Sequence, residues 1–182
     1  KSNSKLDVIL SKSLVLTGMM GVGKSTIGKT LAEKLSFDFI DIDKLIEDKE
    51  GCSINLIFKN KGEVYFRRIE NMLSLQKLTK HNSVISLGGG AFLNDSIRRA
   101  VKESTISFWL DVDVNELVKR LNKTKKRPLL FKKNLNETVK KIYLARKKTY
   151  SEANFRIKCN FLKQETIVNK ILKLYENSKN KI

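Results

Sequence analysis

Leu14-Val-Leu-Thr-Gly-Met-Met-Gly-Val-Gly-Lys-Ser-Thr26 is the stretch of this sequence that decides its fold. Its glycines, lysine and serine fill the pattern G-x-x-x-x-G-K-[ST], a loop whose backbone N–H groups surround phosphate groups. An apolar run leads into the loop, and an amphipathic helical pattern from Lys24 to Ser36 leads out of it. A helix that begins at such a loop also points its partly positive N-terminus at the anion. The stretch therefore predicts a nucleotide phosphate site held between a strand and a helix.

Each position of this loop has a predicted role. The Lys24 ammonium is a mobile cation for the β- and γ-phosphates, and the Ser25 hydroxyl is a ligand for Mg²⁺. The predicted nucleotide contacts are Gly21, Val22, Gly23, Lys24, Ser25 and Thr26.

Apolar runs alternate with helical patterns along the rest of the chain. Strands are predicted at 37–43, 83–88, 105–111 and 155–159, and helices at 44–50, 53–60, 62–80, 94–102, 115–121, 137–153 and 164–177. This alternation is typical of an α/β fold, a parallel sheet covered by helices on both faces, with ligands at the carboxyl ends of the strands. A length of 182 residues suits a single domain.

Composition excludes some classes of protein and leaves one alternative open. No run approaches the length of a membrane span, and the polar start of the chain lacks the apolar region of a signal peptide. Cys52 and Cys159 lie far apart without metal-binding spacing, which favours free thiols in a reducing, cytoplasmic setting. His81 is expected on the surface. The net charge of +18 suggests nucleic acid as a partner. However, the lysines are dispersed, which favours a solvated surface instead.

Two carboxylates close the second predicted strand, in Asp41-Ile-Asp43. Alternation along a strand places Asp41 and Asp43 on one face, at the edge of the sheet where the phosphate loop opens. One carboxylate is predicted to hold Mg²⁺, and the other to accept the proton of a substrate hydroxyl. Helix capping by Asp43 is compatible with that role. A rival pair, Asp111 and Asp113, also ends a strand, but capping by Asp113 accounts for it.

Two further motifs predict recognition of an acid. Arg67 and Glu70 lie three residues apart on a predicted helix, so the carboxylate can orient the guanidinium. An oriented guanidinium binds a carboxylate with two parallel hydrogen bonds. Gly88, Gly89 and Gly90 follow a buried strand and expose backbone N–H groups to a ligand.

Three other arginines are candidates for the same cleft. Arg120 and Arg127 flank or lie in a basic, aperiodic loop at 123–134, which is predicted to close over anionic phosphates. Arg146, on the following helix, is a further cation that can face the cleft.

Taken in order, these motifs resemble the shikimate kinase family. The matching set is Gly-Met-x-Gly-x-Gly-Lys-Ser-Thr, Asp-x-Asp, Gly-x-Ser-Ile-x-x-Ile-Phe-x-x-x-Gly-Glu-x-x-Phe-Arg-x-x-Glu, Gly-Gly-Gly and Arg-Pro-Leu-Leu, between about Leu14 and Ile171. The resemblance implies a five-stranded parallel sheet of the nucleoside-monophosphate-kinase type. It also implies a helical substrate-binding region at about 43–80 and a lid at about 122–135, within a single domain at 1–182.

The resemblance also implies a role for each candidate residue. Lys24, Asp43 and Arg127 would be catalytic, with Asp43 as the base that also contacts the shikimate hydroxyls. Ser25 and Asp41 would hold Mg²⁺, Arg120 would lie near adenine, and Glu70 would orient an arginine. The substrate-binding residues would be Asp43, Arg67, Gly88, Gly89, Gly90 and Arg146.

The implied reaction is transfer of a phosphoryl group from ATP to the 3-hydroxyl of shikimate, by a cytoplasmic monomer that needs neither nucleic acid nor a membrane. A kinase for another acidic polyol, such as gluconate kinase, is the alternative within enzymes. The nucleic-acid-binding protein suggested by the charge is the alternative outside them. The sequence departs from the family at 160–165, where a short Arg/Pro-containing loop that borders adenine is replaced by Asn-Phe-Leu-Lys-Gln-Glu.

Overall fold

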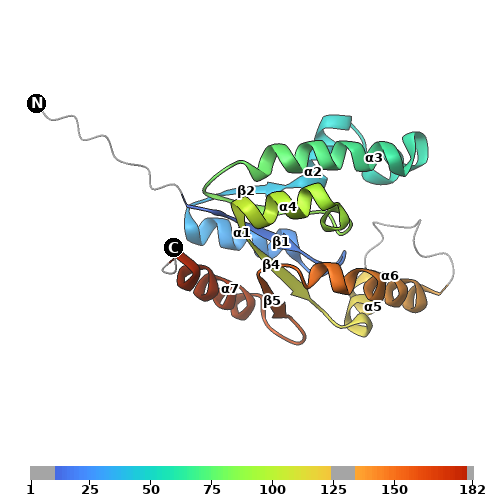
Figure 1. Cartoon of the computed structure of the whole chain (residues 1–182). Coiled ribbons are helices and arrows are strands. Elements are labelled where there is room, and N and C mark those ends of the chain that lie inside the picture. Colours follow the sequence, from blue (N-terminus) through green and yellow to red (C-terminus); the bar gives the residue numbers. More distant parts are fainter. Residues whose placement is uncertain (1–10, 124–133, 180–182) are drawn as a thin grey trace, which may run out of the picture.

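The computed structural model describes residues 11–123 and 134–179 of the chain (Figure 1). One parallel sheet forms its centre, in the strand order β2-β3-β1-β4-β5. Its strands are β1 Ser13–Thr17, β2 Asp38–Asp41, β3 Ser83–Ser86, β4 Thr105–Asp111 and β5 Phe155–Lys158. The expected five-stranded parallel sheet is confirmed.

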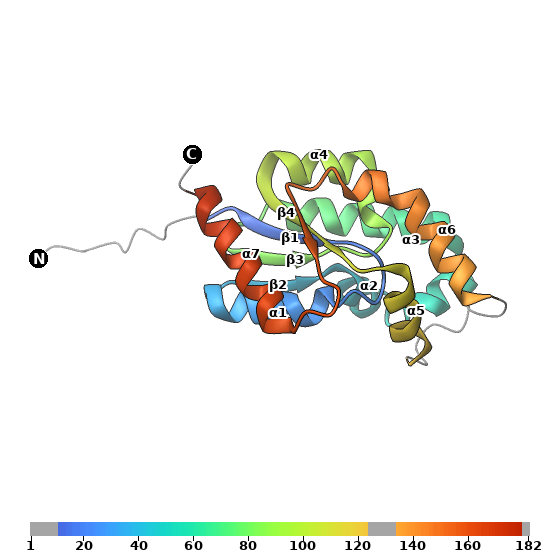
Figure 2. The same ribbon diagram turned by 90° about the horizontal axis from the view of Figure 1, so that it is seen from below.

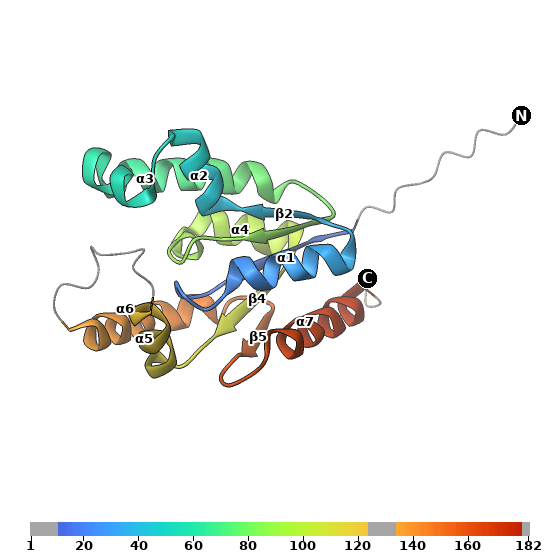
Figure 3. The same cartoon turned by 180° about the vertical axis from the view of Figure 1, so that it is seen from behind.

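Helices cover both faces of this sheet. Figures 2 and 3 show α1 and α7 on one face, α3 and α4 on the other, and α5 and α6 beyond the carboxyl ends of the strands. The helices are α1 Lys24–Leu35, α2 Ile42–Glu50, α3 Ile54–Leu78, α4 Asp95–Ser104, α5 Val114–Asn122, α6 Leu135–Tyr150 and α7 Gln164–Lys179, with a short 3₁₀ helix, η1, at Ala91–Leu93. Since every strand runs in the same direction, the loops that follow the strands gather at one edge.

The central strands are buried on both faces because helices cover both. All five residues of β1 and all seven of β4 are buried. Trp109 of β4 packs on Tyr150 at the end of α6, with 5.9 Å between the ring centroids. This contact fixes the end of α6 against the middle of the sheet.

The second strand is shorter than predicted. It ends at Asp41, because the Asp41 side chain accepts a hydrogen bond from the Lys44 backbone N–H and so caps α2. The capping role that the sequence suggested for Asp43 therefore belongs to Asp41, and Asp43 lies in the first turn of α2. The prediction that both side chains share one face of a strand was wrong.

The two helices predicted at 53–60 and 62–80 form one element, α3. Gly62 interrupts it, with a φ of 80° and a ψ of 171° outside the helical region. Ser53 caps the first half by accepting a hydrogen bond from Leu56 N–H. The second half carries Phe66, Ile69 and Leu73 on its buried side, as the spacing predicts. The 3₁₀ helix η1 was not predicted.

None of the helices in the described ranges combines the length and apolar character that a membrane crossing requires.

Candidate active site

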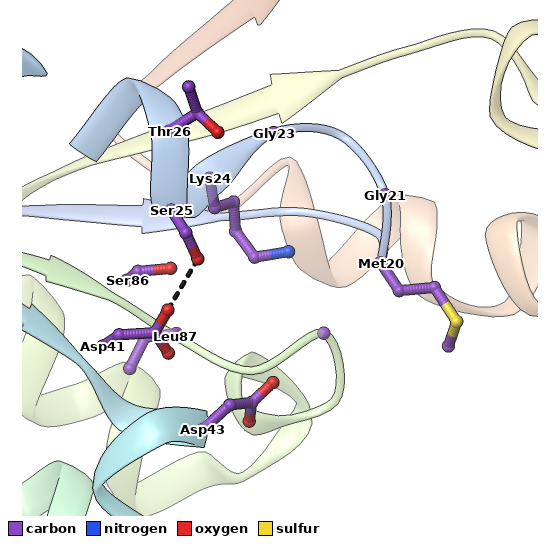
Figure 4. A pocket seen from close by; sticks show the side chains of 11 residues that line it. Met20, Gly21, Gly23, Lys24, Ser25, Thr26, Asp41, Asp43, Ser86 and Leu87 are labelled. Carbon is purple, nitrogen blue, oxygen red and sulfur yellow. Dashed lines mark hydrogen bonds between the residues drawn. The ribbon is translucent and has the colours of Figure 1, made fainter. Parts of the chain in front are cut away.

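A cavity of about 230 Å³ opens at the carboxyl ends of β1, β2 and β3 (Figure 4). Three segments that are far apart in the sequence line it. They are the phosphate loop with the start of α1, the junction of β2 and α2, and the residues after β3. The lining residues are Met20, Gly21, Gly23, Lys24, Ser25, Thr26, Asp41, Asp43, Ser86, Leu87 and Gly89.

The phosphate loop holds its lysine over the cavity. Gly21 and Gly23 have φ angles of 81° and 98°, in the left-handed region that glycine adopts without strain. The Lys24 ammonium donates to the carbonyls of Gly18 and Met19 at 2.8 and 2.9 Å. In Figure 4 its side chain extends from the start of α1 into the space that Asp43 borders from the opposite side. The loop thus has the form that the motif predicts.

Ser25 and Asp41 form a pair of hard oxygen ligands at this cavity. The Ser25 hydroxyl donates to Asp41 Oδ2 at 2.6 Å, while Asp41 Oδ1 caps α2. Mg²⁺ in phosphate-transfer sites is usually bound by one or two protein oxygens, with phosphates and water completing its shell. Ser25 and Asp41 therefore fit the metal that the sequence predicts.

The glycine loop after β3 gathers four charged side chains around it. A Cβ atom placed on Gly88 would lie 2.7 Å from Asp43 Oδ1 and 2.8 Å from Glu70 Oε1. On Gly90 it would lie 2.6 Å from both terminal nitrogens of Arg67, and on Gly89 it would lie 3.5 Å from Arg146 Nη1. A side chain at Gly88 or Gly90 would displace Asp43, Glu70 or Arg67, whereas Arg146 lies at ordinary contact distance from Gly89. The loop thus works as a floor on which Asp43, Arg67, Glu70 and Arg146 converge. The sequence proposed these residues from four separate segments, and the structure brings them together.

Glu70 is a buried carboxylate that orients Arg67. Arg67 Nη1 donates to Glu70 Oε2 at 2.7 Å, and the Glu70 side chain is only 3% exposed. The second oxygen, Oε1, is buried and has no hydrogen-bond partner among the described residues. Burial raises the pKa of Glu70, and nearby Asp43 raises it further, whereas Arg67 and Arg146 lower it. The net direction is upward.

Arg120 and the loop after β5 border the outer side of the phosphate loop. Arg120 pairs with Glu116 at 3.2 Å and donates to the Val22 carbonyl at 3.4 Å. Gln164 of the unusual 160–165 segment donates to the Thr26 carbonyl and to Thr30 Oγ1. The segment therefore reaches the nucleotide side of the site although it lacks proline. Arg127 and most of the predicted lid lie outside the described residues.

The rival carboxylate pair does not line the cavity. Asp111 accepts two hydrogen bonds from Arg156, at 2.6 and 2.9 Å, and one from the Tyr143 hydroxyl at 3.0 Å. Burial and the neighbouring Asp111 carboxylate raise the pKa of Tyr143 to about 12. Asp113 occupies the position that caps α5, but its side chain makes no cap hydrogen bond. The sequence analysis explained Asp113 by capping, and the structure does not support that explanation.

Sequence reasoning missed two residues, one that holds the glycine loop and one that holds the 3₁₀ helix after it. The buried Tyr150 hydroxyl donates to the Gly89 carbonyl. Arg98 donates to the carbonyls of Phe92 and Leu93 in η1, at 2.9 and 2.8 Å. Both contacts are to backbone carbonyls, which every residue type has, so the identity of the partner residue does not reveal them. The available signal for Tyr150 was its position, one helical turn after Arg146.

Comparison with known proteins points to one family. The family model for shikimate kinase matches residues 20–176. A shikimate kinase from Sulfurihydrogenibium sp. (strain YO3AOP1) is 43% identical over 161 residues, covering 88% of this chain and 96% of the relative.

Solved structures give the same picture. Shikimate kinase from Acinetobacter baumannii, in complex with shikimate, has a TM-score of 0.88 and 32% identity, covering 93% of this chain and 95% of that one. A gluconokinase from Sinorhizobium meliloti 1021 has a TM-score of 0.57 and 16% identity over 94% of this chain and 98% of its own, a likeness that concerns the fold alone.

Proposed function

Because this chain belongs to the shikimate kinase family, we propose that it transfers the terminal phosphoryl group of ATP to the 3-hydroxyl of shikimate. The products are ADP and 3-phosphoshikimate, in the route to chorismate and the aromatic amino acids. The observation that carries the proposal is that Lys24 and Asp43 line the same cavity, at opposite sides of it. A phosphate donor and a hydroxyl acceptor must meet at such a place.

On the donor side, the loop from Gly21 to Thr26 binds the phosphates of ATP. Its N–H groups and the Lys24 ammonium offset the charge that spreads over the transferred group. Ser25 and Asp41 would hold Mg²⁺, which when bound neutralises charge on the β- and γ-phosphates.

On the acceptor side, the shikimate carboxylate binds between Arg67 and Arg146, over the N–H groups of Gly89 and Gly90. Glu70 keeps the Arg67 guanidinium in place through the 2.7 Å ion pair. Gly88 lets Asp43 and Glu70 approach the loop, so Asp43 is held at the boundary between the two sides.

Asp43 acts as the base in this scheme. Its carboxylate accepts a hydrogen bond from the 3-hydroxyl, orients the oxygen toward the terminal phosphorus, and takes the proton as the new bond forms. The remaining catalytic work is positioning and charge stabilisation, since the phosphoryl group is only loosely bonded in the transition state.

Within the single domain, we assign 43–80 as the substrate-binding region and 122–135 as the lid. Arg127 would reach the ATP phosphates when the lid closes, and Arg120 would border the adenine. The protein would act as a cytoplasmic monomer without a nucleic-acid or membrane partner. Sedimentation velocity, and a polynucleotide titration near 100 mM salt, check the oligomeric state and the nucleic-acid alternative.

The experiment that tests the proposal is a coupled assay of ADP release with a panel of acceptors. We expect release to depend on shikimate, with gluconate as the matched acidic-polyol control giving only the basal ATPase rate. Release driven by gluconate and not by shikimate would overturn the assignment in favour of the alternative kinase.

A further inference from the structure

The phenol of Tyr150 lies beneath the glycine loop, outside the set of residues assigned above. Its side chain is completely buried, against Trp109 of the central sheet. Its hydroxyl donates to the carbonyl of Gly89 and lies 3.9 Å from the sulfur of Met19 in the phosphate loop. One side chain thus contacts both loops that form the floor of the cavity.

The hydrogen bond to Gly89 fixes the orientation of the next N–H group. The Gly89 carbonyl and the Gly90 N–H belong to the same peptide unit, and in a planar trans peptide the two bonds point in opposite directions. With its carbonyl turned down to Tyr150, this peptide directs the Gly90 N–H away from the core. Among the described residues, no backbone–backbone hydrogen bond from the Gly89 N–H or the Gly90 N–H is present. The Cα of Gly90 also lies against the Arg67 guanidinium.

The two loops lie close together at the same point. A Cβ on Gly89 would lie 3.4 Å from the Met20 nitrogen and 3.7 Å from the Gly18 carbonyl oxygen. A rotation of the Gly89–Gly90 peptide would turn the Gly90 N–H away from the cavity, whereas the phosphate loop keeps the hydrogen bonds that Lys24 donates to the carbonyls of Gly18 and Met19. Because Tyr150 holds the carbonyl from below, it restricts that rotation.

Helix α6 supplies both groups from one face. Arg146 and Tyr150 lie four residues apart, so they occupy successive turns on the same side. Arg146 approaches Gly89 beside the cavity, and Tyr150 approaches it from the core. Burial raises the pKa of Tyr150, which keeps the phenol protonated as the donor, while Arg146 opposes the shift.

We propose that Tyr150 is a positioning residue for the acid substrate, which presents the Gly90 N–H to the carboxylate held by Arg67 and Arg146. The inference rests on the proposed function and extends it to a residue that does not touch the substrate. Loss of the hydroxyl frees the peptide to rotate, so the acid loses a preoriented donor while the nucleotide keeps its own contacts.

The test compares Tyr150→Phe with Tyr175→Phe. Tyr175 is a matched control because it is also completely buried and its hydroxyl also donates to a backbone carbonyl, that of Lys12, at 2.7 Å. We expect Tyr150→Phe to raise the KM for shikimate about 3- to 10-fold, the range for one net hydrogen bond. The KM for ATP should stay within about twofold, and Tyr175→Phe should leave both constants unchanged. Preference for shikimate over its methyl ester should also fall in Tyr150→Phe.

A shikimate KM that is unchanged, or KM values for both substrates that rise together, would overturn the inference. A second measurement needs no variant. In ¹⁵N-glycine-labelled wild-type protein, shikimate should shift the Gly90 amide resonance and slow its hydrogen exchange, and an unaffected Gly90 would overturn the inference even if Tyr150→Phe did not fold. Wild-type protein that ignores shikimate would overturn the proposed function itself, so the two failures are distinguishable.

Discussion

Two arginine–carboxylate pairs lie near the carboxyl ends of the strands, and they differ in how completely they are bonded. In the pair of Arg156 and Asp111, both carboxylate oxygens have partners, since Arg156 donates to one and Tyr143 to the other. In the pair of Arg67 and Glu70, one oxygen of the buried carboxylate has no hydrogen-bond partner among the described residues. The Arg67 guanidinium lies against Gly90, next to the cavity.

The difference teaches how to separate a structural pair from a binding pair. A buried carboxylate whose oxygens are all bonded gains nothing from a ligand and fixes the elements that carry it, here β4, β5 and α6. A buried carboxylate with an unbonded oxygen has a desolvation cost that persists until another group approaches. The first pair should therefore matter for folding. The second should matter for the substrate, because the Arg67 guanidinium beside Gly90 can meet a carboxylate, whereas the unbonded Glu70 oxygen can accept a hydrogen bond from a hydroxyl or water.

The largest effect is expected at Asp43, which lies beside the pair of Arg67 and Glu70. Asp43→Asn keeps the shape of the side chain but removes the base, so kcat should fall about 10²- to 10⁴-fold. The KM for ATP should change little. Asp48→Asn is the control, because Asp48 lies on the same helix in an exposed pair with Lys44. A variant Asp43→Asn with near wild-type kcat would remove the proposed role as base.

Replacing Arg67, the arginine paired with Glu70, should weaken the binding of shikimate and leave the binding of ATP nearly unchanged. Arg67→Ala should raise the KM for shikimate about 10- to 100-fold, the range for a charge-assisted hydrogen bond, and leave the KM for ATP within about threefold. The preference for shikimate over its methyl ester should shrink by a similar factor. The adjacent, exposed Arg68 provides the control Arg68→Ala. Equal losses for both substrates would contradict the carboxylate pocket.

Replacing Asp111, the carboxylate paired with Arg156, should lower the stability of the fold instead of affecting substrate binding. Asp111→Asn leaves Arg156 and Tyr143 with a weaker acceptor, so the free energy of unfolding should fall by about 2 kcal/mol. The KM for shikimate in the folded fraction should be unchanged. Urea denaturation measures the free energy of unfolding, and steady-state kinetics measures the KM for shikimate. Asp113→Asn is the control variant for both. A selective change in shikimate KM would show that the two pairs are not separate.

The smallest effect is the pH dependence of stability that Glu70 contributes. Because burial raises its pKa above the ordinary 4.5, the folded chain holds this proton to a higher pH than the unfolded chain does. That contribution to stability is complete below pH 4.5 and is lost as the pH rises through the raised pKa. Wild type should therefore lose stability relative to Glu70→Gln as the pH increases above 4.5. Glu63, the exposed partner of Arg67, provides the control variant Glu63→Gln. The measurement is the free energy of unfolding as a function of pH, and parallel curves for wild type and Glu70→Gln would refute the raised pKa of Glu70.

The phosphate loop was predictable because all its determinants are local. The strand, the glycines, the lysine and the helix follow one another within 13 residues, from Leu14 to Thr26, and the backbone geometry follows from them. The parallel sheet covered by helices on both faces was also accessible, since strands that alternate with helices along the chain favour that architecture.

The proposed binding site for the acid was harder to predict, because Arg67, Glu70, the glycines and Arg146 meet only through the topology of the sheet. Spacing alone gave the pairing of Arg67 with Glu70, but only the family resemblance joined them to Arg146 and the glycines. The end of β2 was misplaced because Asp41 and Asp43 both suit a cap, and the choice depends on the hydrogen bond to Lys44 N–H. Tyr150 was not predicted from the sequence because its hydrogen-bond partner is a backbone carbonyl.

The central claim is that ATP and shikimate occupy adjoining parts of one cavity with Asp43 between them. A crystal structure of the chain with ADP and shikimate tests it most directly, through the distance from the shikimate 3-hydroxyl oxygen to the Asp43 carboxylate. We predict a separation of about 2.6 to 3.2 Å, with the hydroxyl facing the phosphates and the carboxylate on Arg67, Arg146 and Gly90. Shikimate bound away from the glycine loop, or turned so that its hydroxyl points away from Lys24, would contradict the account.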